Sequence, residues 1–235
     1  MKLTVVTLRK LLKQNSNPEK AVVLSRFFKA CPGEYGEGDK FYGITVPELR
    51  KIARQYQSLM LEDLKILIYS EYHEERMLAL LILMSQYKKS EEEKERKKIY
   101  DFYLKNMQQI NNWDLVDLSA PHIVGHYLFE KDRTVLYRWA ENKNFWIRRI
   151  GMLSTFYFIR QNEFEDTLKI ADILLQDNED LIHKAVGWLL REVGKRDESL
   201  LEKFLKPRYQ KMPRTMLRYA IEKFSESKRR FYLEK

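Results

Sequence analysis

Apolar residues recur at helical spacing along almost the whole chain. Near the N-terminus, Val5, Leu8, Leu11 and Leu12 fall on one face of a helix. Strand-rich folds need many turn residues, but only 8 glycines and 6 prolines occur in 235 residues. No segment has the alternating pattern of a strand, so the chain is predicted to be all-α. Beyond the first two helices, helical segments are expected around 47–57, 60–69, 71–87, 90–108, 112–129, 132–141, 144–161, 163–176, 178–194, 197–206 and 212–226.

Two short segments have the composition of helix starts. Asn17 is placed to cap a helix that has Pro18 in its first position. Thr45 and Glu48 have the spacing of a capping box. Between these starts, residues 32–43 hold four of the eight glycines and are expected to form the one long loop. The second helix, expected to end before the loop, carries the apolar residues Val22, Val23, Phe27 and Phe28.

Three segments share a pattern in which a basic residue precedes an apolar run that contains a small residue. They begin at Arg76, Arg149 and Lys184, with spacings of 73 and 35 residues. These spacings are close to two units and one unit of a helix pair. Units of that size cannot bury their hydrophobic faces alone, and they stack into a curved α-solenoid. We therefore predict an α-solenoid with about 12 helices in a single domain over residues 1–235.

Cysteine content and hydropathy restrict the setting in which the protein works. Cys31 is the single cysteine, which excludes an internal disulfide framework and a cysteine-based zinc site. His122 and His126 lie one helical turn apart, but no third ligand is near, so no metal site is predicted. The longest apolar stretch, 77–84, has eight residues against the roughly 20 needed to span a bilayer. No signal peptide is visible, and we expect a reduced, soluble, cytoplasmic protein without a membrane partner.

Basic charge is concentrated at the C-terminus. The chain has a net charge of +9, and residues 203–235 hold eleven Lys or Arg against three Glu. Aromatic residues are interleaved with this basic block: Tyr209, Tyr219, Phe224, Phe231 and Tyr232. Such a combination is typical of proteins that bind a phosphate backbone. A solvated helix face followed by a frayed tail is the alternative.

The segment around Trp113 is a candidate for chemistry, because the common catalytic motifs for nucleotides, serine hydrolases and metalloproteases are absent. Asn112 is placed to cap a helix that begins at Trp113. Trp113 and Asp117 then lie one turn apart on one face. Asp114 lies in the first turn, where the helix dipole suffices to explain it. Asp117 lies one turn further into the helix, where the dipole does not explain it. The alternative to a functional role for this pair is that Trp113 is a core residue and Asp117 a solvated or capping aspartate.

Two later segments are further candidates. Arg148 and Arg149 project about 100° apart on a helix, so one can face solvent or phosphate while the other faces a concave surface. Gly187 is expected to clear room beside the indole of Trp188. A role in the core is the alternative for each of these residues.

Taken together, these segments resemble the DNA alkylation repair family of AlkD type. The matching motifs are Asn17-Pro18-Glu19-Lys20-Ala21, Gly43-Ile44-x-x-Pro47-Glu48, Trp113-Asp114-x-Val116-Asp117, Trp146-x-x-Arg149 and Lys184-Ala185-Val186-Gly187-Trp188-x-Leu190-Arg191-Glu192. The resemblance implies HEAT-like helical repeats that cradle duplex DNA. It also implies a monofunctional DNA-alkylpurine glycosylase that removes N3- and N7-alkylated purines by hydrolysing the N-glycosidic bond, without metal or cofactor.

The resemblance also implies roles for individual residues. The Asp117 carboxylate would stabilise an oxocarbenium-like transition state and orient the attacking water. Trp113 and Trp188 would hold the cationic nucleotide, since an indole face attracts a cation by roughly 0.5–2 kcal/mol. Arg149 would clamp a neighbouring phosphate. The further residues expected to contact DNA or substrate are Arg148, Lys184 and Phe27.

The chain departs from the family's pattern in two places. Phe27 stands where the family often has a tyrosine, and we expect a weaker substrate preference from the missing hydroxyl. The loop 32–43 is longer than in some relatives. The family is thought to act from the sugar and backbone side, and the sequence shows no obvious base pocket.

Three functions are compatible with these sequence features. The expected one is a monomeric bacterial glycosylase that binds duplex DNA containing alkylated purines and associates with the nucleoid during repair. The alternatives are a non-catalytic DNA-structure-binding HEAT-repeat protein and a protein-interaction solenoid. The salt dependence of DNA binding separates the first two from the third, because phosphate contacts make binding strongly salt-sensitive.

Overall fold

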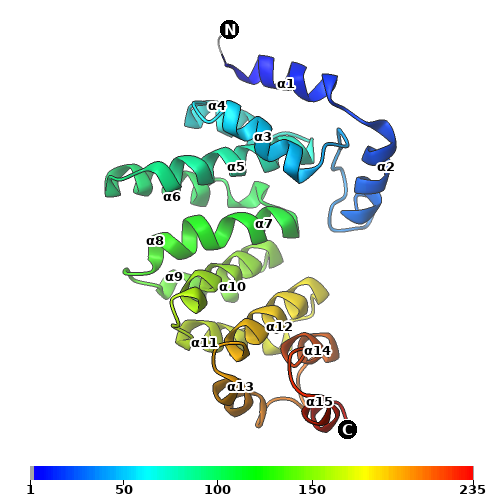
Figure 1. The fold of residues 1–235 in the computed structure, drawn as a ribbon, viewed down its shortest axis with the longest axis vertical. Helices are drawn as coiled ribbons and strands as arrows, with labels where there is room; N and C mark the ends of the chain where they lie inside the picture. The colour runs from blue at the N-terminus through cyan, green and yellow to red at the C-terminus, as the bar shows by residue number, and fades with distance from the viewer. Residues whose placement is uncertain (1–2, 235) are drawn as a thin grey trace. The chain divides into compact units, whose positions relative to one another are not determined.

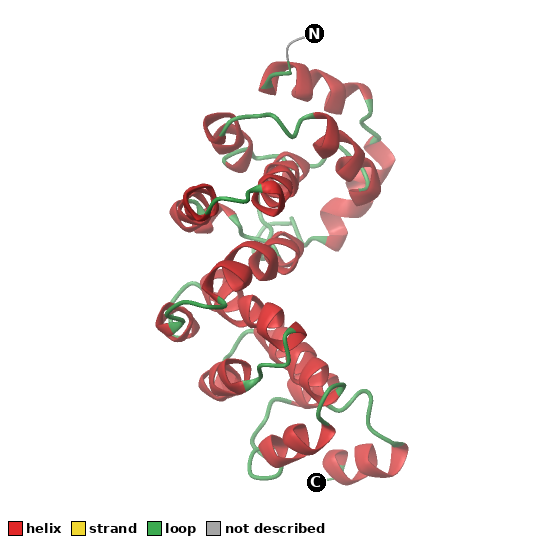
Figure 2. Cartoon of the chain, turned by 60° about the vertical axis from the view of Figure 1, so that its left-hand side comes forward, coloured by secondary structure: helices red, strands yellow, loops and turns green. Residues whose placement is uncertain are grey.

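The computed structural model describes residues 3–234, which form helices joined by loops (Figure 1). The prediction of an all-α chain is confirmed: within residues 3–234 the only β-type pairing is an isolated bridge between Lys40 and Tyr72, and Figure 2 draws no strand. The elements are α1 (Val5–Gln14), α2 (Pro18–Phe27), α3 (Val46–Gln55), α4 (Leu61–Ile68), α5 (His73–Lys89), α6 (Glu93–Lys105), η1 (Met107–Gln109), α7 (Trp113–Ala120), η2 (Pro121–Gly125), α8 (His126–Leu128), α9 (Thr134–Ala140), α10 (Phe145–Arg160), α11 (Glu165–Ile173), η3 (Leu174–Gln176), α12 (Asp180–Gly194), α13 (Glu198–Leu205), α14 (Arg214–Ala220) and α15 (Glu226–Leu233).

Both predicted helix starts are confirmed. The Asn17 side chain accepts a hydrogen bond from the Lys20 backbone N–H at 2.9 Å. The Glu48 carboxylate accepts one from the Thr45 backbone N–H at 2.9 Å, as a capping box requires. Gly43 ends the loop between these helices with φ of 83°, and a Cβ there would lie 2.1 Å from the Asn17 carbonyl oxygen. Only glycine allows the end of the loop to approach the start of α2 this closely.

Some predicted helices are divided in the structure. The segment 112–129 is divided by η2, a π-helical turn that begins at Pro121. Proline lacks a backbone N–H and its ring crowds the preceding turn, which disturbs α-helical hydrogen bonding at this point. The single helix predicted for 212–226 is wrong, because α14 ends at Ala220 and α15 begins at Glu226. Ser225 caps α15 by accepting a hydrogen bond from the Lys228 N–H at 3.4 Å, so these residues are helical rather than frayed.

The helices pack into two compact units, divided between Ser119 and Ala120. In the first unit α5 packs against α3, α4 and α6. Almost every residue from His73 to Leu83 is buried, because α5 is covered on all sides. Helix α5 is therefore the centre of the first unit.

In the second unit α10 and α12 pack against each other and against the shorter helices around them. Gly187 on α12 permits the approach of α14: a Cβ at this position would lie 2.5 Å from the Met216 carbonyl oxygen and 2.6 Å from Tyr219 Cβ. The segments that start at Arg76, Arg149 and Lys184 begin within the first two turns of α5, α10 and α12, the long helices of the two units. A single repeat domain over residues 1–235 stays a prediction. No helix within residues 3–234 has the length and apolar character to cross a membrane.

Candidate functional site

The first unit contains a pocket of about 600 Å³. Its walls come from α2, α3, α5 and α7 and from the loop between α2 and α3. Aromatic side chains from three of these segments line it: Phe27, Phe28, Phe41 and Trp113. Sequence reasoning did not find this cavity, because its walls come from residues far apart in the sequence.

The aromatic residues of the pocket contact one another. The Phe28 ring stacks with Trp113 at 5.5 Å between centroids and with Phe41 at 5.7 Å. Phe27 meets the Trp113 indole edge-on at 5.7 Å. Phe28 is buried, whereas Phe27 is 58% exposed and lies at the rim. These contacts fix the ring of Trp113 beside the pocket while leaving the face of Phe27 accessible.

Helix α7 supplies the tryptophan and the aspartate that the sequence singled out. It begins at Trp113 as predicted, and the Asn112 side chain accepts a hydrogen bond from the Trp113 N–H at 2.9 Å. Trp113 and Asp117 both line the pocket, together with Phe27. The structure thus brings three of the predicted site residues to one cavity.

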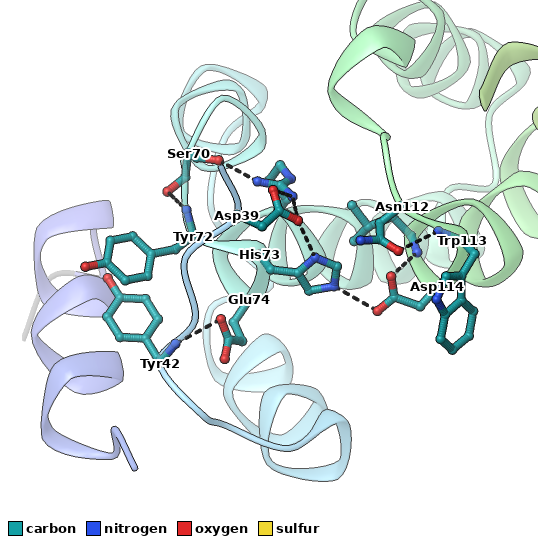
Figure 3. Close-up of polar contacts among 11 residues, drawn as sticks. Asp39, Tyr42, Ser70, Tyr72, His73, Glu74, Asn112, Trp113 and Asp114 are labelled. Carbon is teal, nitrogen blue, oxygen red and sulfur yellow. Dashed lines mark hydrogen bonds and ion pairs between the residues drawn. The ribbon is translucent and has the colours of Figure 1, made fainter. Parts of the chain in front are cut away.

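A buried ionic cluster supports one wall of this pocket (Figure 3). His73 lies between two carboxylates, with Nε2 at 2.9 Å from Asp114 Oδ2 and Nδ1 at 3.2 Å from Asp39 Oδ2. Arg76 donates to both oxygens of Asp39 at 2.7 Å. The His73 ring also stacks on Phe28 at 4.5 Å. The cluster therefore joins the loop between α2 and α3 to α5 and α7.

Protonation of His73 follows from this geometry. Burial opposes the charged imidazolium, but the hydrogen bonds to Asp114 and Asp39 outweigh it and raise the pKa of His73 to about 9. Burial also opposes ionisation of Asp39, and here the bond to His73 and the charge of Arg76 prevail, so the pKa of Asp39 is lowered. At neutral pH an imidazolium therefore lies between two carboxylates. Attributing Asp114 to the helix dipole alone is wrong, since its carboxylate is a partner of His73.

The residues after His73 attach the glycine-rich loop to α5. Glu74 accepts hydrogen bonds from three backbone N–H groups, those of Tyr42 at 3.1 Å, Gly43 at 2.8 Å and Ile44 at 3.3 Å. Glu75 accepts from the Tyr42 hydroxyl at 2.9 Å. The end of the loop is thereby held against the first turn of α5, where it places Phe41 in the pocket wall.

Sequence reasoning missed the roles of Asp39, His73 and Phe41. The available signal was the run His73-Glu74-Glu75-Arg76 directly before the apolar stretch 77–84. Four polar residues at the start of a helix that is otherwise buried require hydrogen-bond or ionic partners elsewhere in the fold. The sequence alone does not say which residues those partners are.

The two arginines of α10 are held by the second unit itself. Arg149 is buried and donates to the Leu181 carbonyl at the start of α12. Arg148 makes a two-pronged ion pair with Asp177, at 2.6 Å from Nε and 3.0 Å from Nη2. Binding of a phosphate by either arginine stays a prediction.

Helix α12 carries the other two predicted contacts. The Trp188 ring lies 5.3 Å from the ring of Phe156. Lys184 forms an exposed ion pair with Asp180 at 2.7 Å, one turn earlier on the helix. Their participation in one site with Trp113 and Asp117 stays a prediction.

The basic block of the second unit is partly neutralised by its own acids. Arg208 pairs with Asp172 at 2.6 Å, and Lys228 pairs with Glu198 at 2.5 Å. Five other basic side chains are exposed and make no ion pair with any residue between 3 and 234: Lys203, Lys206, Lys211, Arg218 and Arg229. Lys235 lies outside the described residues. A set of solvated cations thus remains available on α13, α14 and α15 and the loops beside them.

No cluster of three or more His, Cys, Asp or Glu side chains between residues 3 and 234 is arranged to hold a metal ion. Cys31 is a free, exposed thiol in the loop after α2. The candidate site consists of aromatic rings, carboxylates and one buried imidazolium.

Together, these features define an all-helical protein with an aromatic and acidic pocket beside a tryptophan–aspartate pair. Comparison of the sequence with known families gives a match to the DNA alkylation repair enzyme family over residues 8–224. The chain therefore belongs to the DNA alkylation repair family, as the resemblance of its motifs suggested.

Solved structures share the fold. A protein from Enterococcus faecalis, described as a predicted DNA alkylation repair enzyme, matches with a TM-score of 0.70 and 18% identity, covering 90% of this chain and 97% of its own. AlkD2 from Streptococcus mutans matches with a TM-score of 0.56 and 16% identity, covering 88% and 98%. The protein smu.31 from Streptococcus mutans UA159 matches with a TM-score of 0.53 and 18% identity, covering 94% and 99%. Comparison with curated proteins found no match.

Proposed function

We propose that this protein is a DNA-alkylpurine glycosylase that releases cationic N3- and N7-alkylated purines from duplex DNA. One observation carries the proposal: Trp113 and Asp117 line the same pocket from one helix, so an indole and a carboxylate face one ligand site. Membership of the DNA alkylation repair family supports a substrate of this class.

The chemistry requires little beyond a placed carboxylate. Alkylation at N3 or N7 makes the purine cationic, so the electron pair of the breaking C1′–N9 bond leaves it neutral. Positive charge develops on the deoxyribose, and the Asp117 carboxylate stabilises it. Water then attacks C1′ and gives up a proton to Asp117, which yields the free base and an abasic sugar. No metal or organic cofactor takes part in these steps.

Selectivity follows from the leaving group. An unmodified purine would have to depart as an anion, and modest electrostatic help does not overcome that barrier. The indole of Trp113 adds to the selectivity because its face attracts a cation by roughly 0.5–2 kcal/mol. The second unit is proposed to contact the lesion and its phosphates through Trp188, Arg149, Arg148 and Lys184. The exposed cations of α13 to α15 are proposed to bind the backbone of the duplex.

The test is release of free base from methylated duplex DNA by the native chain and by Asp117→Asn. Removing one preorganised charge from a transition state costs on the order of 10²–10³ in rate, and we expect a loss of that size with DNA binding retained. Asp101→Asn is the matched control, since Asp101 is exposed on α6 and pairs with Lys97 at 2.7 Å. Equal release by the native chain and Asp117→Asn would refute the role of Asp117. Binding without any release by the native chain would favour the non-catalytic DNA-binding alternative.

A further inference from the structure

Helix α7 carries both Trp113 and Asp117 on only eight residues. A π-helical turn from Pro121 to Gly125 follows it directly, so regular α-helical hydrogen bonding does not continue beyond its end. Isolated helices shorter than roughly 12 residues are marginal in water. The position of both side chains in the pocket therefore depends on tertiary contacts that hold α7 in place.

Side-chain contacts fix α7 near both of its ends. At the far end, Ser119 shares a hydrogen bond of 3.0 Å with the hydroxyl of Tyr103, and both residues are fully buried. At the near end, Asp114 Oδ2 lies 2.9 Å from His73 Nε2. Asp117 lies between these two points, three residues after Asp114 and two before Ser119. The contact between Asp114 and His73 is therefore one of two that set where the Asp117 carboxylate points.

His73 reaches the start of α7 by two routes. The first is polar: one oxygen of Asp114 accepts from the Leu115 backbone N–H at 2.8 Å, while the other faces His73. The second is through rings, because Phe28 stacks on His73 at 4.5 Å and on Trp113 at 5.5 Å. The imidazole thus supports both the backbone of the first turn and the indole that projects from it.

The charges that face the His73 ring balance one another (Figure 3). Asp39, from the loop between α2 and α3, lies 3.2 Å from Nδ1, and Asp114, from α7, lies 2.9 Å from Nε2. Arg76, one turn later on α5, donates to Asp39 at 2.7 Å. An imidazolium donates to both carboxylates, whereas a neutral imidazole has a single N–H and can donate to only one. Without the proton the carboxylates outnumber the cations, and their repulsion moves the first turn of α7 away from α5.

We propose that His73 is a positioning residue for base release: its hydrogen bonds to Asp39 and Asp114 hold the first turn of α7 so that Trp113 and Asp117 face the pocket. The inference rests on the proposed function, and it deepens that function by adding a residue that acts on the reaction through Asp114. Placement has a large effect on catalysis, since a misplacement of about 1 Å can cost on the order of 10²-fold in rate.

The first experiment follows α7 without DNA, by fluorine NMR of the full chain labelled with 5-fluorotryptophan. The chain has four tryptophans, and loss of one signal in Trp113→Phe identifies that of Trp113. We expect His73→Gln to displace the Trp113 signal at neutral pH and to leave that of Trp139 in place. In the native protein the Trp113 signal should move as the pH rises through about 9, where His73 loses its proton. An unchanged Trp113 signal in His73→Gln, or across this pH range in the native protein, would overturn the proposal.

The second experiment separates positioning from stability. Single-turnover release of base from methylated duplex DNA, and the affinity for that duplex, are measured under conditions in which urea unfolding shows each variant to be folded. Arg9→Gln is the matched control, because Arg9 of α1 pairs with the buried Glu75 in the same turn of α5 at 2.8 Å. We expect His73→Gln to release base roughly 10–100-fold more slowly with its affinity for the duplex unchanged, and Arg9→Gln to retain the native rate. A native rate for His73→Gln, or an equal loss in both variants, would overturn the proposal.

Asp114→Asn tests whether His73 acts through Asp114. If the two residues act through one contact, the double variant His73→Gln/Asp114→Asn loses no more activity than the more impaired single variant. Losses that multiply would show that His73 acts by another route and would overturn the proposal.

Failure of this inference and failure of the glycosylase give different results. Absence of base release by the native chain, together with a Trp113 signal that His73→Gln displaces, would refute the glycosylase and leave the hold of His73 on α7 intact. Base release by the native chain, together with a native rate and an unchanged Trp113 signal in His73→Gln, would refute the role of His73 and leave the glycosylase intact.

Discussion

Replacing His73 by glutamine is expected to remove a pH-dependent part of the protein's stability. His73 is 3% exposed and donates to Asp39 and Asp114, which raise its pKa from 6.5 to about 9. A raised pKa means that the folded state binds the proton more tightly than the unfolded state does. The resulting stabilisation is fully present below pH 6.5 and is lost as the pH rises through about 9.

The size of this pH-dependent stabilisation follows from the shift in the pKa of His73. One pKa unit corresponds to 1.36 kcal/mol, so a rise from 6.5 to about 9 corresponds to roughly 3 kcal/mol in the free energy of unfolding. Leaving Asp114 without its buried partner gives a cost of the same order, about 3–5 kcal/mol. His73→Gln is therefore expected to be destabilised by about 3 kcal/mol below pH 6.5, and by much less above pH 9, where the native imidazole is neutral.

The measurement is urea unfolding of both proteins at a series of pH values between these limits, followed as the difference between the two unfolding free energies. Lys169→Gln is the control, because Lys169 forms an exposed ion pair with Glu165. The pKa of Lys169 is raised from 10.5, so this side chain stays charged throughout the pH range of the experiment. We expect the control to run parallel to the native protein throughout. Parallel curves for His73→Gln as well would refute the assignment of a buried imidazolium.

Outcomes are also expected for four other variants. Gly187→Ala should lower the free energy of unfolding by about 2 kcal/mol, because its Cβ would meet the Met216 carbonyl oxygen at 2.5 Å. Gly151→Ala should lower it less, since its nearest neighbour is at 3.1 Å, and equal losses in urea unfolding would contradict this reasoning. Arg229→Ala should reduce the slope of log affinity for duplex DNA against log salt by about one, and an unchanged slope would remove Arg229 from the phosphate contacts. Phe27→Tyr should sharpen the preference between alkylated bases, measured as the ratio of release rates, and an unchanged ratio would show that the hydroxyl has no part in selectivity.

Local features of the chain were predictable because they depend on neighbours within one helical turn. The caps at Asn17 and Thr45 follow from side chains that reach backbone groups three residues away. Trp113 and Asp117 share a face because the helix repeat places residues four apart together. The boundary between α14 and α15 was missed, because the same basic and aromatic composition continues through both helices and a serine cap is a weak signal.

The sequence by itself determined an all-helical chain, the basic block near its C-terminus and the motifs of the DNA alkylation repair family, all of which are readable from spacing and composition. Only the tertiary structure decided the pocket and its charge. Phe27, Phe41 and Trp113 become one aromatic wall only when α2, its following loop and α7 meet. His73 is separated by 34 and 41 positions from the two carboxylates that hold its proton. Its pKa depends on burial and on those distances, which are properties of the folded chain and not of any segment of it.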